Sequence, residues 1–254
     1  MNPKRILLRI LLLVRDIVQV IAPRQEVSIL CYHGIGDARD GDSGTTVAVA
    51  AFEAQLTTLH ANGTVFVSLA DVLAWQRGER ELPRRALALT FDDGYADFAT
   101  EALPLLERYH APATLFVVGD AVAARAYLGD QLLSEPAIHE LARHPLVTIG
   151  YHSRSHPDFL ACAGAELETE CASRYGARFF AYPGGKYTVE TPEILRKIGY
   201  EAACTIKPEL VQKYGDPFML PRTVIERDTP LWVVRAATTR ASSWYRAARR
   251  LCKR

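Results

Sequence analysis

The sequence lacks several features that would place it in a specialised class of protein. Its five cysteines form no C-x-x-C pair, so neither a disulfide framework nor a thiolate zinc site is indicated. Its formal net charge is only +1, which argues against a dedicated nucleic-acid-binding protein. No internal repeat and no Gly/Ser-rich linker divides the 254 residues. These absences give no sign of a second domain. The length is sufficient for one α/β domain.

The chain also lacks an uninterrupted apolar run at its start. Residues 6–21 are strongly apolar, but Arg9, Arg15 and Asp16 interrupt them, which makes a poor membrane-spanning helix and a poor signal peptide. Most polar residues of this segment fall on one side of a helical wheel. We therefore predict an amphipathic helix over residues 1–23, which either lies in a membrane interface or packs on the core of the domain.

The last segment of the chain, residues 231–254, is basic. No acidic residue lies between Arg235 and Arg254, so this predicted helix or tail is either attracted to anionic lipid or simply solvated. Between the two terminal segments, residues 24–230 are expected to form the main domain. With no convincing export signal, we predict a cytoplasmic protein whose ends contact the inner membrane face.

Short runs of β-forming residues alternate with helical segments along this domain. Such alternation predicts a largely parallel sheet or barrel. The expected strands are residues 27–31, 64–68, 86–91, 113–118, 147–151, 178–182 and 202–206. The expected helices are residues 51–61, 69–77, 97–109, 135–143 and 191–198.

Polar residues follow several of the expected strands directly. In parallel β/α architectures the carboxyl ends of the strands meet at the end that carries the active site. The residues placed there are His33, Asp92, Asp93, His152, His156, Tyr182, Pro183 and Gly184. We expect the functional site to be built from this set.

Two pairs in this set suggest metal chemistry when they are taken together. One of Asp92 and Asp93 could act as general base while the other binds a metal, although Asp-Asp-Gly also makes an ordinary turn. His152 and His156 could turn both imidazoles to one point, although two surface histidines would have the same spacing. Two imidazoles with one carboxylate form a three-ligand set that leaves a position open for water. The combination favours a metal site.

The motifs resemble those of the polysaccharide deacetylases with the NodB homology domain, also called carbohydrate esterase family 4. The matching segments are Thr90–Tyr95, His152–His156, Phe180–Gly185 and Ala111–Val117. The resemblance covers roughly residues 27 to 225. It implies a distorted (β/α) barrel of about seven strands. It also implies hydrolysis of the N-acetyl group of an amino sugar, in a polysaccharide or a lipid-linked glycan, with release of acetate.

The resemblance also implies roles for particular residues. Asp92 becomes the catalytic base, and the Gly184 amide becomes a donor to the oxyanion, at a position where the family usually has tyrosine. The implied metal ligands, for one divalent ion that is usually zinc, are Asp93, His152 and His156. The expected substrate-binding residues are Tyr95, Tyr182 and Pro183.

The chain departs from the family pattern at two further positions. Many members have an arginine beside the third motif, where this chain has Ala181, and a C-terminal histidine, whereas no histidine follows His156 here. Arg222 could grip Asp92 in place of that arginine, or form a purely structural salt bridge. His33 could be the general acid, as in members whose motifs are circularly permuted, or a buried structural histidine.

Two other functions remain compatible with the sequence. The same fold and metal could serve a deacylase of another small amide or of a formylated sugar. A non-catalytic glycan-binding domain is disfavoured, because binding a glycan needs aromatic platforms but no metal-activated water. The expected partner is an acetylated amino-sugar substrate, with no nucleic acid and a peripheral contact with anionic membrane.

Overall fold

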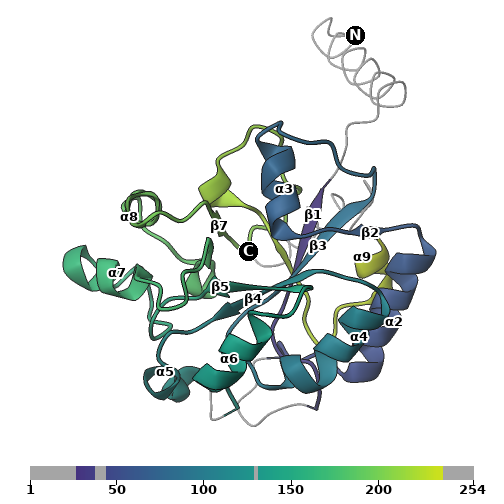
Figure 1. Ribbon diagram of the computed structural model, residues 1–254, viewed down its shortest axis with the longest axis horizontal. Helices are drawn as coiled ribbons and strands as arrows, with labels where there is room; N and C mark the ends of the chain where they lie inside the picture. Colours follow the sequence, from purple (N-terminus) through teal and green to yellow (C-terminus); the bar gives the residue numbers. More distant parts are fainter. Residues whose placement is uncertain (1–26, 38–43, 129–130, 237–254) are drawn as a thin grey trace, which may run out of the picture.

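Figure 1 shows the computed structural model, which describes residues 27–37, 44–128 and 131–236. Within those ranges, no helix is long and apolar enough to cross a lipid bilayer. The predicted helix over residues 1–23 and the basic segment after residue 236 lie outside the described residues, so their contact with a membrane stays a prediction.

A curled sheet of parallel strands forms the centre of the molecule (Figure 1). Seven strands follow the order β7-β6-β5-β4-β3-β1-β8, and β2 pairs with β3 beside this path. Their bounds are β1 Ser28–Tyr32, β2 Val65–Phe66, β3 Ala86–Phe91, β4 Ala113–Val117, β5 Val147–Tyr151, β6 Phe179–Ala181, β7 Ala202–Cys204 and β8 Thr223–Val224. The predicted distorted barrel is thereby confirmed.

The two faces of β3 explain why its sequence is apolar throughout. Leu87 and Leu89 pack into the core cluster that lies beneath the helices, whereas Ala86 and Ala88 belong to a second cluster shared with β6 and β7. Side chains alternate along a strand, so the second set points to the inside of the curled sheet. Continuing this register predicts that Asp92, just past the strand, also points inward.

A short segment near the end of the domain joins the two edges of the sheet. Leu220 donates its amide to the carbonyl of Ala203 on β7 at 2.9 Å. Three residues later, Thr223 pairs with Leu30 on β1. Residues 220–224, which include β8, therefore link β7 to β1, and Arg222 lies in the middle of this closing segment.

Helices cover the outside of the sheet (Figure 1). The longer ones agree with the sequence expectation, and α3 begins with a reciprocal capping box between Ser68 and Asp71. The helical bounds are α2 Val49–Ala61, α3 Leu69–Gln76, η1 Phe98–Ala102, α4 Leu103–Arg108, α5 Ala121–Leu128, α6 Glu135–Leu141, α7 Gly164–Cys171, η2 Pro183–Gly185, α8 Thr191–Ile198, η3 Pro217–Met219 and α9 Leu231–Ala236.

The helical segments differ from the sequence prediction in two respects. The expected helix over residues 97–109 is divided into a π-helical turn, η1, and the α-helix α4, because Pro104 has no amide hydrogen to continue the ladder. Helices α5 and α7 were not predicted. The predicted basic segment begins with α9, whose Val234 belongs to the main core cluster.

A substitution at Gly150, in strand β5, can test how tightly the side chains of the sheet are packed. A Cβ atom there would lie 2.4 Å from a ring carbon of Phe116 on β4. We expect Gly150→Ala to lower the free energy of unfolding by about 1–3 kcal/mol, as overpacking does. Urea unfolding should show a smaller loss when the same change is made in a Phe116→Leu background. Equal losses in both backgrounds would contradict the predicted clash.

Candidate active site

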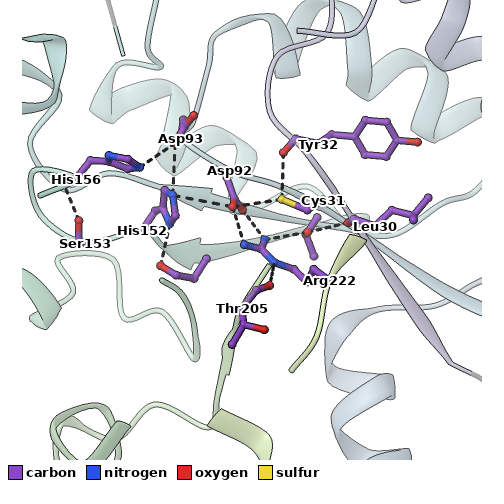
Figure 2. Close-up of polar contacts among 12 residues, drawn as sticks. Leu30, Cys31, Tyr32, Asp92, Asp93, His152, Ser153, His156, Thr205 and Arg222 are labelled. Carbon is purple, nitrogen blue, oxygen red and sulfur yellow. Dashed lines mark hydrogen bonds and ion pairs between the residues drawn. The ribbon is translucent and has the colours of Figure 1, made fainter. Parts of the chain in front are cut away.

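Four of the residues predicted at the strand ends converge at one end of the barrel (Figure 2). Asp92 and Asp93 follow β3, and His152 follows β5. His156 lies four residues farther along the same loop. Arg222 reaches the group from the closing segment of the sheet.

Asp92 and Arg222 form a buried, two-pronged ion pair (Figure 2). Arg222 Nη1 donates to Oδ1 at 2.6 Å, and Nη2 donates to Oδ2 at 2.7 Å. Arg222 is 0% exposed and Asp92 is 2% exposed. Parallel N–H···O bonds between guanidinium and carboxylate fix both direction and distance. The expected contact between these residues is therefore present.

Other contacts hold the guanidinium of Arg222 in place. Its Nε donates to the carbonyl of Thr205 at 3.1 Å, and Nη1 also donates to the hydroxyl of Thr90 at 3.1 Å. The guanidinium carbon lies 5.3 Å from the centre of the Phe116 ring. The arginine thus joins β3, β4 and the residue after β7, besides closing the sheet.

This arrangement controls the charge of Asp92. Burial alone would raise the pKa of its carboxyl group, but the charge and hydrogen bonds of Arg222 outweigh burial and hold that pKa well below its usual range. The neighbouring Cys31 thiol lies 3.4 Å from Asp92 Oδ2 as a further donor. Burial raises the pKa of Cys31 and raises that of Cys204 to about 12, so both thiols stay neutral. Asp92 is consequently ionised across the neutral range.

Asp93 and the two histidines form a compact second group. His152 Nε2 lies 3.4 Å from Asp93 Oδ1, and His156 Nε2 lies 3.7 Å from the same oxygen. One ligand-type atom from each of the three residues lies within 4.8 Å of the other two. The φ angle of Asp93 is 74°, a left-handed conformation that turns its side chain away from the direction taken by Asp92.

The donor atoms of this group fit a divalent cation. Two ligand atoms that are each about 2.1 Å from a tetrahedral zinc ion lie roughly 3.4 Å apart. The two distances to Asp93 Oδ1 are close to that value. This oxygen is also buried and has no hydrogen-bond partner among the described residues, which is costly for a carboxylate unless a cation is bound. Imidazole and carboxylate are both ordinary zinc ligands.

The ring of His152 is held in the orientation that a ligand needs. Its Nδ1 lies 2.8 Å from the carbonyl oxygen of Ala181 on β6, and only a protonated nitrogen can donate there. Nε2 therefore carries the free lone pair, and it faces Asp93. Burial lowers the pKa of His152 to about 4, more than the neighbouring carboxylates raise it. The imidazole is neutral near pH 7, as metal binding requires.

The loop between the two histidines has a strained backbone. Ser153 and His156 have φ angles of 67° and 57°, in the left-handed region that non-glycine residues rarely adopt. Each such residue costs on the order of 1–3 kcal/mol, so surrounding contacts must hold the loop. Within it, the Ser153 hydroxyl accepts the amide hydrogen of His156 at 2.9 Å.

His33 lies beside the base rather than beside the two other histidines. One of its ring nitrogens is within 4.8 Å of both the Cys31 sulfur and an Asp92 oxygen. Its Nδ1 is buried, and no described residue forms a hydrogen bond with it. The first strand end therefore contributes an imidazole to the site, although this position alone does not assign it the role of general acid.

The remaining predicted residues are distributed differently. Gly184 is exposed, with a φ angle of 56°, and a Cβ atom added there would meet nothing within 4 Å. Tyr182 is 0% exposed, and its hydroxyl donates to the carbonyl of Phe218. Pro183 is buried, and Tyr95 is 8% exposed. These three side chains therefore offer little surface to a sugar, and we infer that they support the loops of the site.

A hollow adjoins the metal-type group. It has a volume of about 190 Å³, and the residues that line it include Asp93, Gly94, Arg174 and Tyr175. The site thus has space beside a proposed ligand, on the side of β4 and α6.

Several residues that complete the site were not predicted from the sequence. Cys31 and Thr90 could have been found, because they share the inward strand register of Ile29 and Ala88. Thr205 contributes a backbone carbonyl, for which its side-chain identity gives no signal.

Comparisons with known proteins agree with the sequence motifs. The sequence profile of the polysaccharide deacetylase family matches residues 79–203. YxkH of Bacillus subtilis strain 168, which carries the name of a polysaccharide deacetylase, is 26% identical over 208 residues, or 78% of this chain and 70% of its own. Poly-β-1,6-N-acetyl-D-glucosamine N-deacetylase of Escherichia coli K12 is 26% identical over 255 residues, covering 82% of this chain but only 38% of the E. coli protein.

A solved structure shares the fold. The deacetylase PplD of Streptococcus pyogenes, in complex with acetate, matches with a TM-score of 0.73 at 22% identity, over 84% of this chain and 98% of its own. The sequence profile and these relatives confirm the family resemblance.

The buried ion pair predicts a large effect of replacing Arg222. Arg222→Met leaves the Asp92 carboxylate buried without its partner, which should cost about 3–5 kcal/mol of unfolding free energy. Urea unfolding of the metal-free protein at pH 7 measures this loss. Arg178→Met is the control, because the Arg178–Glu201 pair is on the surface and should be worth less than about 1 kcal/mol.

The effect of Arg222→Met should also depend on pH. In the wild type the pKa of Asp92 is lowered, so the pair stabilises the fold above the ordinary carboxyl pKa and loses that contribution as the pH falls toward the folded-state pKa. In the variant, burial is no longer outweighed by Arg222 and raises the pKa of Asp92, so stability should fall as the pH rises above about 4. A difference between the two proteins that does not change with pH would contradict the pairing.

Proposed function

Because residues 79–203 belong to the polysaccharide deacetylase family, we propose that this chain hydrolyses the N-acetyl group of an amino sugar, in a polysaccharide or a lipid-linked glycan, and releases acetate. The observation that carries the proposal is the convergence of Asp93, His152 and His156 beside an ionised Asp92. An ionised base next to a set of potential metal ligands is the arrangement that metal-assisted hydrolysis of an amide requires.

The substrate class is supported by what the relatives are named for. The E. coli relative is an N-deacetylase of poly-β-1,6-N-acetyl-D-glucosamine, although this chain spans only 38% of its length. An acetylated amino-sugar chain is therefore the substrate that we propose. The proposal does not include the β-1,6 linkage named for the E. coli relative. The hollow beside Asp93 supplies space for part of such a molecule.

Asp93, His152 and His156 would hold one divalent cation, and their nitrogen and oxygen donors favour zinc. Such an ion, when bound, polarises the amide carbonyl and lowers the pKa of water. The protein's part is to keep His152 neutral, through burial, and correctly oriented, through the carbonyl of Ala181. Asp93 contributes its Oδ1, which has no hydrogen-bond partner among the described residues.

Asp92 is the proposed general base. Arg222 keeps its carboxylate charged and fixes the plane of its oxygens, so the side chain needs no rearrangement before it accepts a proton from water. The same pairing makes the carboxylate a weak base. It can therefore act only on a water whose pKa has been lowered.

His33 is the proposed general acid, and Gly184 the proposed donor to the oxyanion. The departing amine needs a proton, and the imidazole of His33 lies near Asp92, with an Nδ1 that forms no hydrogen bond to any described residue. Gly184 is exposed and the space around its α-carbon is open, which suits a loop amide that donates to a substrate oxygen.

Two substitutions test the proton-transfer roles with one assay. Asp92→Asn and His33→Ala should each lower the rate of acetate release by about 10²- to 10⁴-fold, the range for general acid/base catalysis. Both should leave zinc content near one ion per chain, because neither residue belongs to the proposed ligand set. Turnover close to that of the wild type in either purified variant would remove that residue from its assigned role.

Metal removal combined with a substrate panel tests the proposed reaction itself. Treating the protein with a chelator should abolish acetate release from N-acetylglucosamine oligomers, and added zinc should restore it. Circular dichroism should change little, since the ligands are held by β3, β5 and β6. Formate release from N-formylated sugars in preference to acetate would favour the deformylase alternative. Glycan binding without metal or acetate release would favour the binding domain.

A further inference from the structure

Glu170 of α7 reaches the loop that carries the two proposed histidine ligands. Its Oε2 accepts the amide hydrogen of Ser155 at 2.9 Å, and its Oε1 accepts the Ser155 hydroxyl at 2.7 Å. Its backbone carbonyl accepts the amide hydrogen of Arg154 at 3.0 Å. Three hydrogen bonds to one residue therefore hold Arg154 and Ser155, two of the three residues between His152 and His156.

The side chain of Glu170 is buried, with 7% exposed. Among the described residues, no lysine, arginine or histidine forms an ion pair with it, so the two donors of Ser155 satisfy its carboxyl group. A buried acidic side chain is costly to keep unless its hydrogen bonds are well made. Both oxygens of its carboxylate form their hydrogen bonds with Ser155 of this loop.

Helix α7 is itself fixed to the sheet. Leu167 and Cys171, on the same helix, pack in a core cluster with Tyr151 of β5 and Phe180 of β6. Glu170 therefore connects the loop to a rigid support that also includes the strand before His152.

We propose that Glu170 is a positioning residue for the metal site: through Ser155 it holds the strained loop in the conformation that directs His156 toward Asp93. This inference rests on the proposed function, since it assumes that His152 and His156 are metal ligands. His152 has its own support, because its ring is bound to the carbonyl of Ala181. His156 ends the strained segment, with a φ angle of 57°, and directly follows Ser155, so the backbone that Glu170 holds leads into this ligand.

The contact geometry predicts different outcomes for two replacements of Glu170. Glu170→Ala removes both side-chain acceptors and should weaken zinc binding by about 10- to 100-fold, as the loss of groups that orient ligands does. Glu170→Gln should stay within a few-fold of the wild type. Its amide oxygen can accept the Ser155 N–H, while its NH₂ group donates to the Ser155 hydroxyl oxygen, which can accept as well as donate.

Ser155 provides an internal check on this reasoning. Ser155→Ala alone keeps the backbone hydrogen bond to Glu170 and should weaken zinc binding only moderately. In combination with Glu170→Gln, it leaves the buried NH₂ group without an acceptor, so the tolerance of glutamine should be lost. This dependence on hydrogen-bond type is not expected if Glu170 only fills space.

The experiment measures zinc affinity in the full chain, by competition with a chromogenic chelator, after circular dichroism has shown each variant to be folded. Glu168→Ala is the matched surface control on α7, because Glu168 is exposed and its carboxylate accepts a hydrogen bond from Lys197, away from the loop. Leu167→Val is the matched core control, because it loosens the same helix without touching the loop. Both should bind zinc like the wild type.

Each outcome decides the matter. Folded Glu170→Ala protein with wild-type zinc affinity, or equal weakening by Leu167→Val, would overturn the positioning role and leave the proposed function standing. A wild-type protein that binds no zinc would overturn both the proposed metal site and this inference. If Glu170→Ala does not fold, the glutamine variants with and without Ser155→Ala decide: loss of affinity only in the combined variant supports the role, and equal affinity overturns it.

Discussion

The ion pair between Asp92 and Arg222 is the interaction on which the rest of the structure depends. It joins the end of β3 to the segment of residues 220–224, which links β7 to β1. Either charge alone would be too costly to bury, so the barrel can close with Arg222 fully inside only because Asp92 meets it. The same contact that completes the fold therefore fixes the proposed catalytic base.

The pair also explains how two adjacent aspartates acquire different chemistry. Asp92 continues the inward register of β3 and meets a permanent cation, which keeps it ionised. Asp93 has a left-handed backbone, so its carboxylate turns to the histidines, with Oδ1 lacking any hydrogen bond from the described residues. The charge of Asp92 is compensated by Arg222, whereas the carboxylate of Asp93 is available to a metal ion. Environment, not residue type, divides the two roles.

The sequence predicted the elements whose signals are local. Apolar runs located the strands, and the polar residues after them located Asp92, Asp93, His152 and His156. The contact of Arg222 with Asp92 could be anticipated from the family resemblance, because this chain has Ala181 where many members have an arginine. The support of Glu170 could not, since nothing in the segment around α7 indicates that it contacts Ser155. Tyr182 was expected at the substrate, but a tyrosine after a strand can equally turn into the core, where its hydroxyl finds a backbone carbonyl.

The proposed ligands illustrate why a site can be prepared before its ion arrives. A carboxylate and two imidazoles gain little from approaching one another without a cation, and the loop conformation that brings them together is itself strained. Their convergence must therefore be maintained by contacts that do not involve the ion. Those contacts come from outside the ligand set: the carbonyl of Ala181 orients His152, and Glu170 holds the loop through Ser155. Because β6 and α7 belong to the packed core, the free energy of folding supplies the organisation that binding then uses.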